Sequence, residues 1–363
     1  MEFINIIPFN IFFIFSYLLF CGKCSSSKLP LVPALYVFGD SLFDSGNNNF
    51  LPTLAKANYY PYGVNFPGSF PTGRFTNGKT TADFIADYLG LPYPTPRVSL
   101  IKPTSLTGYN YASGSCGILP ETGKFVGECL NLDEQMKMFE TTVKIQLGLH
   151  FRNRTELAQY LAKSIFIFSV GNNDYINTYF GIVKTRQHYS PPQFAKLLVD
   201  SLSRKLQRLY DLGARKIVVF ELGPIGCIPS IMRGLRPKGI KCDENKNKIV
   251  SLFNNELGLM LNNLSLTLQH SHFIIGRAHS LAYDAIINPA KYGLRDSSNP
   301  CCKSWLNGTF SCIPELTPCS APDEHFFWDG YHLTEATCSV VASHCINGSD
   351  VCLPINIQQL VQA

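Results

Sequence analysis

The chain contains a serine whose surroundings suit nucleophilic chemistry. Ser41 lies in the run Phe-Gly-Asp-Ser-Leu-Phe-Asp-Ser-Gly-Asn-Asn at positions 38–48, directly after an apolar segment at 34–38. A strand that ends in such a turn presents its serine at the edge of an open α/β sheet, where these sheets do their chemistry. Because a serine hydroxyl is a poor nucleophile until a base takes its proton, the assignment depends on partners elsewhere in the chain.

His332 has the best context of the eight histidines to be that base. Asp329 precedes it by three residues, in Phe-Trp-Asp-Gly-Tyr-His at 327–332. An Asp and a His at this spacing can hydrogen-bond, so that Asp329 would fix the tautomer of His332 and stabilise its cation. Taken alone, the pair is more consistent with a chance pairing at the surface.

Two turns could supply donors for the negative charge of a tetrahedral intermediate. Gly-Asn-Asn-Asp at 171–174 follows an apolar run at 164–170, and an asparagine side chain there could donate an N–H. The backbone N–H of Gly114, in Asn-Tyr-Ala-Ser-Gly at 110–114, is a second candidate. Ordinary turn chemistry explains each turn when it is judged singly, since Gly and Asn tolerate positive φ.

The elements that must position these residues alternate along the chain. Such alternation predicts a parallel sheet with helices on both faces, and right-handed crossovers bring the loops at 39–44, 113–117 and 171–175 to one edge. The loop at 329–333 comes from the C-terminal stretch, and a Pro-, Gly- and aromatic-rich segment at 51–78 suits an irregular loop. We expect strands at residues 34–38, 109–112, 164–170, 216–222 and 272–276, and helices at 80–89, 132–147, 192–212 and 246–268.

The four motifs together, in this order, resemble the GDSL branch of the SGNH hydrolases, specifically the plant-type GDSL esterase/lipases. The resemblance runs from about residue 34 to residue 338. It also covers Gly-Arg-Phe-Thr-Asn-Gly-Lys at 73–79 and Gly-Pro-Ile-Gly-Cys at 223–227. The fold that it implies is a three-layer α/β/α sandwich around a central five-stranded parallel sheet, with a shallow, open site.

The resemblance also implies a role for each site residue. Ser41 would be the nucleophile, and Asp329 and His332 would complete a catalytic triad. The oxyanion hole would consist of the backbone N–H groups of Ser41 and Gly114 and the side chain of Asn173, because the first asparagine of Gly-Asn-Asn-Asp falls at a variable position of the family pattern.

Two positions depart from that pattern. The family usually has another glycine after Gly114, where this chain has Ser115 and Cys116, so a disulfide at Cys116 would lock this loop while the N–H of Gly114 stays available. Leu333 stands where a proline often follows the histidine, and we expect little consequence from that change.

The implied activity is that of a secreted serine esterase/lipase that forms an acyl-enzyme on an acyl-ester substrate, either a lipid or an acylated polymer. No cofactor and no metal are expected. Acyl transfer in the building of cutin-like polymers and deacetylation of polysaccharide are alternatives at the same site. A non-catalytic secreted glycoprotein that kept the fold for binding is the alternative from another class.

The N-terminus predicts the compartment. An apolar block at 11–20 is followed by Cys-Ser-Ser-Ser at 24–27, which is typical of a secretory signal peptide. We therefore expect a signal peptide at residues 1–26 and a single hydrolase domain at 27–363, in the extracellular space or cell wall. Glu2 is the only charged residue before the block, which is unusual, so a signal anchor is the alternative. No later apolar stretch is long enough to span a bilayer.

Thirteen cysteines in a secreted chain indicate disulfides. Removal of Cys21 and Cys24 with the signal leaves an odd number, so at least one thiol could stay free. Local pairs are plausible between Cys116 and Cys129 and between Cys227 and Cys242. The connectivity of the remaining seven, from position 301 onward, cannot be deduced from spacing.

Surface chemistry adds two expectations. Asn-x-Ser/Thr sites predict glycan acceptors on surface loops at Asn153, Asn263, Asn307 and Asn347. The formal charge of +5 is mild and the basic residues are scattered, except around 238–248, so the sequence does not favour nucleic-acid binding.

Other patterns are weaker. Residues 73–80 match the phosphate-cradling pattern G-x-x-x-x-G-K-[ST], but a phosphate loop must follow a strand, and the Pro- and aromatic-rich residues before it do not form one. The segment is better explained as the start of a helix at Thr80. No G-x-S-x-G elbow is present. Aromatics at 59–62 could line a pocket, although packing within the loop is the more economical explanation.

Overall fold

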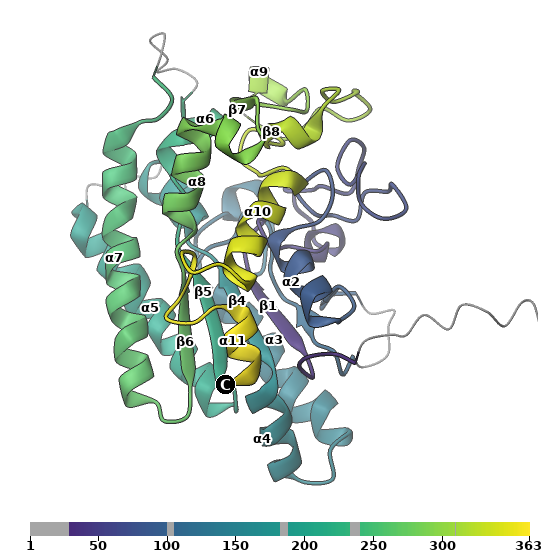
Figure 1. Ribbon diagram of the computed structural model, residues 1–363, viewed down its shortest axis with the longest axis vertical. Coiled ribbons are helices and arrows are strands. Elements are labelled where there is room, and N and C mark those ends of the chain that lie inside the picture. The colour runs from purple at the N-terminus through teal and green to yellow at the C-terminus, as the bar shows by residue number, and fades with distance from the viewer. Residues whose placement is uncertain (1–28, 100–104, 182–187, 233–239, 309) are drawn as a thin grey trace, which may run out of the picture.

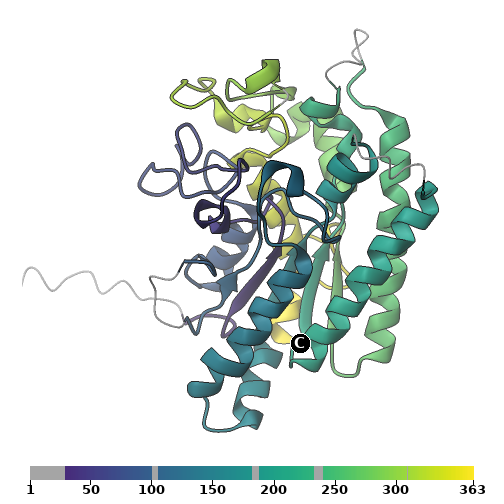
Figure 2. The same ribbon diagram turned by 180° about the vertical axis from the view of Figure 1, so that it is seen from behind.

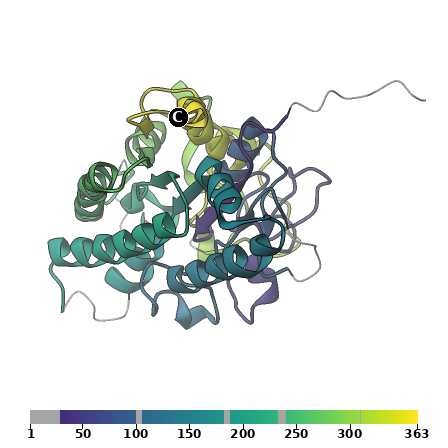
Figure 3. The same ribbon diagram turned by 90° about the horizontal axis from the view of Figure 1, so that it is seen from below.

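The protein is a three-layer α/β/α sandwich. The computed structural model describes residues 29–99, 105–181, 188–232, 240–308 and 310–363, so the predicted signal peptide at 1–26 lies outside the described residues. Helices α2, α10 and α11 lie in front of the sheet in Figure 1, and α3 and α5 come to the front when the molecule is turned around in Figure 2. Seen from below, the C-terminal helix and the α3–α5 layer lie on opposite sides (Figure 3).

The central sheet has seven strands in the order β2-β3-β1-β4-β5-β6-β9. Its first six strands run parallel, and β9 pairs antiparallel to β6. All five predicted strands are present at the centre, and two-residue strands extend each edge. The strands are β1 (Leu35–Gly39), β2 (Thr95–Pro96), β3 (Tyr109–Asn110), β4 (Ile165–Ser169), β5 (Lys216–Phe220), β6 (His272–Gly276) and β9 (Cys352–Leu353).

Alternate residues of the strands pack into two separate cores. In β1, Tyr36 and Phe38 belong to one cluster and Leu35 and Val37 to the other, as the two-residue period of a strand requires. The first core is covered by α3 (Leu132–Thr141), α4 (Arg154–Lys163), α5 (Pro191–Asp211) and α7 (Glu244–Thr267). The second is covered by α2 (Thr81–Leu89), α8 (Ala278–Ile287), α10 (Glu335–Ile346) and α11 (Ile357–Gln362). Within the described ranges, no helix combines the length and apolarity needed to cross a bilayer.

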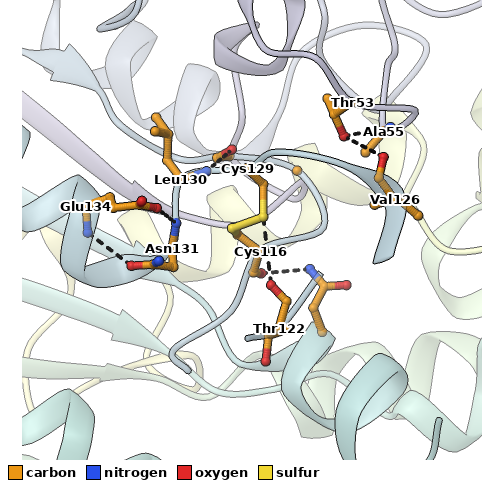
Figure 4. The surroundings of a disulfide bond; sticks show 12 residues. Thr53, Ala55, Cys116, Thr122, Val126, Cys129, Leu130, Asn131 and Glu134 are labelled. Atoms are coloured by element: carbon orange, nitrogen blue, oxygen red, sulfur yellow. Dashed lines mark hydrogen bonds between the residues drawn. A yellow bond between two sulfur atoms is a disulfide. The ribbon is translucent and has the colours of Figure 1, made fainter. Parts of the chain in front are cut away.

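Side-chain caps fix where the helices begin. Thr80 caps α2 and forms a reciprocal capping box with Asp83, so the predicted helix start at Thr80 is confirmed. Asn131 and Glu134 form the same box at α3 (Figure 4). The predicted helix at 132–147 is interrupted, because α3 ends at Thr141 and continues as a π-helical segment to Gln146 and a 3₁₀ turn.

The stretch that carries the predicted acid and base sits above the carboxyl ends of the strands. There β7 (Asp296–Pro300) and β8 (His325–Phe327) form a two-stranded parallel sheet, accompanied by the short helices α6 (Pro229–Met232) and α9 (Trp305–Gly308). In Figure 1 these elements form the top of the molecule, next to the loops that follow β1.

Disulfides fasten the loops at this edge. Both predicted local pairs are present, Cys116–Cys129 and Cys227–Cys242, and the first is drawn in Figure 4. The cluster that spacing could not resolve pairs as Cys301–Cys319, Cys302–Cys312 and Cys345–Cys352. Cys338 is the free and buried thiol among the described cysteines, which accounts for the odd number.

The segment at 73–80 is structural rather than a phosphate loop. It follows irregular chain, not a strand. Arg74 is 5% exposed and makes two hydrogen bonds of 2.7 Å to the Asp83 carboxylate, while its guanidinium stacks on Phe66 at 4.5 Å from the ring centre. This pair joins the long loop to the first turn of α2.

Arg74→Ala should destabilise the fold strongly. The substitution leaves the buried Asp83 carboxylate without its counter-charge, which typically costs about 3–5 kcal/mol. Urea unfolding with the disulfides intact measures the loss. Lys196→Ala breaks the exposed Lys196–Asp200 pair and is the matched control, with an expected loss of at most about 0.5 kcal/mol. Equal effects of the two variants would contradict the structural role of Arg74.

Candidate active site

Ser41, His332 and Asp329 form one hydrogen-bonded chain. The Oγ of Ser41 lies 2.7 Å from Nε2 of His332, although the two residues are 291 positions apart. Nδ1 of His332 lies 2.8 Å from both carboxylate oxygens of Asp329. A base within hydrogen-bond reach of the hydroxyl, itself oriented by an acid, is the arrangement that activates a serine.

Asp329 is fully buried and still favours its ionised form. Backbone N–H groups of Tyr331 and His332 each donate to Oδ1 at 2.8 Å, and the Tyr62 hydroxyl donates to Oδ2 at 2.6 Å. Burial alone would raise the pKa of this carboxyl. The charge of His332 and these hydrogen bonds outweigh burial, so the pKa of Asp329 is lowered. The carboxylate is therefore available to stabilise a cation on His332.

The nucleophile turn is fastened to the sheet and to α3. Gly39, the last residue of β1, makes two hydrogen bonds with the side chain of Gln135. The N–H of Gly39 donates to Oε1 of Gln135 at 2.9 Å, and Nε2 of Gln135 donates to the carbonyl of Gly39 at 2.8 Å. Gly39 has φ +147°, and a Cβ there would stand 2.0 Å from the carbonyl oxygen of Ser169 in β4. Only glycine permits this approach. The next residue, Asp40, donates its N–H to the same carbonyl at 3.0 Å.

Asn173 is held in place on two sides after β4. Its Nδ2 donates to the carbonyl of Cys116 at 3.0 Å, and its Oδ1 accepts from Asn177 at 3.3 Å. A primary amide carries two hydrogens, so one N–H remains for another acceptor. Asn172 instead donates to the Asp40 carboxylate at 3.4 Å.

The loop at Gly114 is bound to the nucleophile loop by Asp44. The N–H of Gly114 donates to Oδ2 of Asp44 at 3.1 Å, and its carbonyl accepts from Asn48 at 3.0 Å. This interaction occupies the N–H that the sequence analysis assigned to an oxyanion. Ser115, the next residue, lines the cavity at Ser41, and its N–H has no acceptor among the described residues.

Comparison with known proteins identifies the family of the chain. A family profile for GDSL-like lipase/acylhydrolase matches residues 35–345. The chain belongs to this GDSL-like family. GDSL esterase/lipase 7 of Arabidopsis thaliana is 43% identical over 347 residues, which cover 93% of this chain and 94% of that protein. A second GDSL esterase/lipase of the same plant is 39% identical over 357 residues, or 96% of this chain and 92% of the relative. Membership of the GDSL-like family makes the protein an ester-hydrolysing enzyme.

The segment at 73–79 contacts His332 and the start of α10. The ring of Phe75 packs on His332 with 5.0 Å between ring centres. Asn77 accepts the N–H of Glu335 at 2.7 Å, at the start of α10 and just after the base. A Cβ on Gly114 would lie 2.7 Å from the Phe75 ring, so glycine at that position lets this ring reach its place. The motif thus positions His332 without reacting itself.

Three positioning residues were missed by sequence reasoning. Tyr62 was considered as pocket or packing; it is fully buried and contacts Asp329. Asp44 stood within the quoted serine motif and received no role, although it joins the two loops. Gln135 gives no signal in a single sequence, because its importance comes from the close approach of α3 to Gly39.

The site opens into a cavity of about 240 Å³. Ser41, Asn173 and His332 line it together with many apolar side chains. Within the described parts of the chain, no three His, Cys, Asp or Glu side chains gather in a way that could hold a metal ion. Asp174 joins its turn to the loop after β3, since its carboxylate accepts the N–H groups of Ile118 and Leu119 at 2.8 and 3.0 Å.

Burial opposes the ionisation of three carboxyl groups near the site. Burial raises the pKa of Asp40, Asp44 and Asp174 from the ordinary 3.8 to about 6, although hydrogen bonds to each lower it in part. A carboxyl with a raised pKa in the folded state stabilises the fold below its unfolded pKa. That contribution is lost as the pH rises through the folded pKa. As the pH rises from about 4 to about 6, the ionisation of these groups therefore lowers the free energy of unfolding.

Asp40→Asn should remove one share of this pH dependence. The amide oxygen can still accept the N–H of Leu42, which the carboxylate accepts at 3.0 Å. A pKa rise from 3.8 to about 6 corresponds to roughly 3 kcal/mol. Urea unfolding at pH 4 and at pH 7 measures the free energy of unfolding of both proteins. From pH 4 to pH 7, the wild type should lose up to this much more stability than the variant. Identical pH profiles would contradict the raised pKa of Asp40.

Proposed function

We propose that the protein is a secreted serine esterase that cleaves acyl esters through Ser41, His332 and Asp329. The observation that carries the proposal is the 2.7 Å contact between the Ser41 Oγ and the His332 Nε2, with the ionised Asp329 behind it. Membership of the GDSL-like family supports the reaction class, and this contact supports Ser41 as the nucleophile.

The reaction proceeds in two halves. His332 takes the proton of Ser41 as Oγ attacks the ester carbonyl, and then gives that proton to the departing alcohol. The acyl group is left on Ser41. Water then attacks the acyl-enzyme, and the same histidine accepts its proton and returns it to Ser41 as the acid leaves. Asp329 stays ionised throughout and stabilises the imidazolium.

The charge on the tetrahedral intermediate needs donors that are already in place. We assign the backbone N–H of Ser41 and the free N–H of Asn173 to this role, as the sequence analysis predicted. For the third donor we propose the backbone N–H of Ser115 in place of that of Gly114. The Gly114 N–H is committed to Asp44, whereas Ser115 lines the cavity beside the nucleophile.

Secretion is supported by the disulfides. Five are present among the described cysteines, and such bonds persist in oxidising compartments. For glycan attachment, Asn153 and Asn347 are exposed at helix ends, and Asn263 is exposed within α7 rather than on a loop. Asn307 lies in the short helix α9. We propose these four positions as acceptors.

Hydrolysis of p-nitrophenyl acetate by the purified protein tests the proposal. Ser41→Ala should abolish detectable turnover above background, and Asp329→Asn should lower kcat by about 10⁴-fold because the histidine loses its orienting carboxylate. Asp40→Asn is the matched control, with the same change beside the nucleophile and an expected loss of less than about tenfold. The assignment is wrong if Ser41→Ala retains the parent rate. If Asp40→Asn is as damaging as Asp329→Asn, the acid has been misassigned.

A further inference from the structure

The cavity at the nucleophile continues away from the loops into the body of the protein. One part of its lining is an exposed rim, in which Leu54 and Phe125 are 83% and 72% exposed. The other part, which we call the inner lobe, lies among α8, α10, β8 and the ends of β1 and β5. Its walls are Phe43, Phe220, Ala282, Phe326, Cys338 and Val341.

Helix α8 leaves room in the inner lobe. Ala278, Ala282 and Ile286 follow one another at four-residue spacing, which places them on one face of the helix. All three line the cavity. The first two carry only a methyl group, so this face of α8 takes up less of the space beside α10 than larger side chains would. The i, i+3 pair Cys338 and Val341 forms the facing wall on α10.

Most of the inner lobe is apolar, although the partly buried Glu221 also lines the cavity next to Phe220. Phe43, Phe220, Phe326 and Val341 are buried. Of its polar neighbours, the Thr81 hydroxyl is already bonded to the Cys338 carbonyl at 3.4 Å. If the alcohol part of the ester lay there and carried further hydroxyl groups, those groups would lose their hydrogen bonds to water without replacement, which is costly. A hydrocarbon chain would instead be stabilised by its transfer out of water.

We propose that the inner lobe binds the acyl chain of a medium-chain ester, and that Ala282 sets the length of chain accepted. The alcohol then leaves over the exposed rim, where solvent can hydrate it. The inference rests on the proposed acylation of Ser41, which joins the acyl carbonyl to the mouth of the lobe. At about 30 Å³ for each methylene, roughly the volume share of a water, the whole cavity of about 240 Å³, rim included, would hold about eight carbons, which sets the upper limit for the lobe.

A series of p-nitrophenyl esters from acetate to dodecanoate tests the length limit. Each added methylene should raise kcat/KM up to about fourfold until about octanoate, and longer chains should gain nothing more. Ala282→Phe should lower the octanoate-to-acetate ratio of kcat/KM at least tenfold. Ser280→Phe adds the same ring on an exposed position of α8 and should leave the ratio unchanged.

Two results would overturn the acyl assignment. One is a wild-type profile that does not rise with chain length. The other is a folded Ala282→Phe protein whose ratio equals that of Ser280→Phe.

A binding measurement separates this inference from the proposed function. Calorimetric titration of Ser41→Ala with octanamide and with acetamide needs no turnover. Octanamide should bind at least tenfold more tightly, and adding Ala282→Phe should remove the difference. If octanamide binds in this way while the wild type hydrolyses no ester, the lobe stands and the esterase proposal fails. Hydrolysis with equal binding of the two amides would refute the lobe instead. If Ala282→Phe does not fold, the smaller Ala282→Val replaces it in both measurements and should lower the preference for octanoate and octanamide in the same direction.

Discussion

The burial of an ionised carboxylate at Asp329 is the constraint on which the rest of the candidate active site depends. A buried charge is tolerated only when it is paired and fully hydrogen-bonded. Each hydrogen bond to Asp329 also positions another part of the site. The backbone N–H of His332 closes the turn at 329–332, and the bond to the His332 ring orients that ring towards Ser41. The bond from Tyr62 attaches the long loop after β1. Tyr62 in turn accepts the N–H of Cys312, so the disulfide-linked C-terminal segment is tied to the same carboxylate.

Much of the fold could be predicted because local sequence patterns determine it. Short, largely apolar segments predicted the five central strands, and their alternation with helices predicted that these strands run parallel. The two edge strands have only two residues each and leave no periodic signal. The π-helical segment after Thr141 was also invisible, since the apolar pattern continues through it. The pairing of Cys301 and Cys302 could not be deduced from spacing, because it depends on how the chain after β7 lies against β8.

The site was predictable to the extent that its residues sit in recognisable motifs. Ser41, Asn173, Asp329 and His332 meet at the carboxyl edge of the sheet, where parallel strands bring their loops together. What the sequence could not give is which groups are already occupied. The N–H of Gly114 was expected to be free, yet the carboxylate of Asp44 is in place to accept it. Such competition depends on distances of about 3 Å between residues that are 70 positions apart.

The most direct test of the account is covalent trapping of the nucleophile. A p-nitrophenyl dialkyl phosphate should form an Oγ–phosphorus bond at Ser41 with release of p-nitrophenolate. Peptide mass spectrometry should then find one dialkyl phosphoryl group on the peptide that contains this serine. In His332→Ala the labelling rate should fall by about 10³-fold or more, because no base remains to take the proton. Labelling of a different residue, or equal rates in the two proteins, would contradict the account.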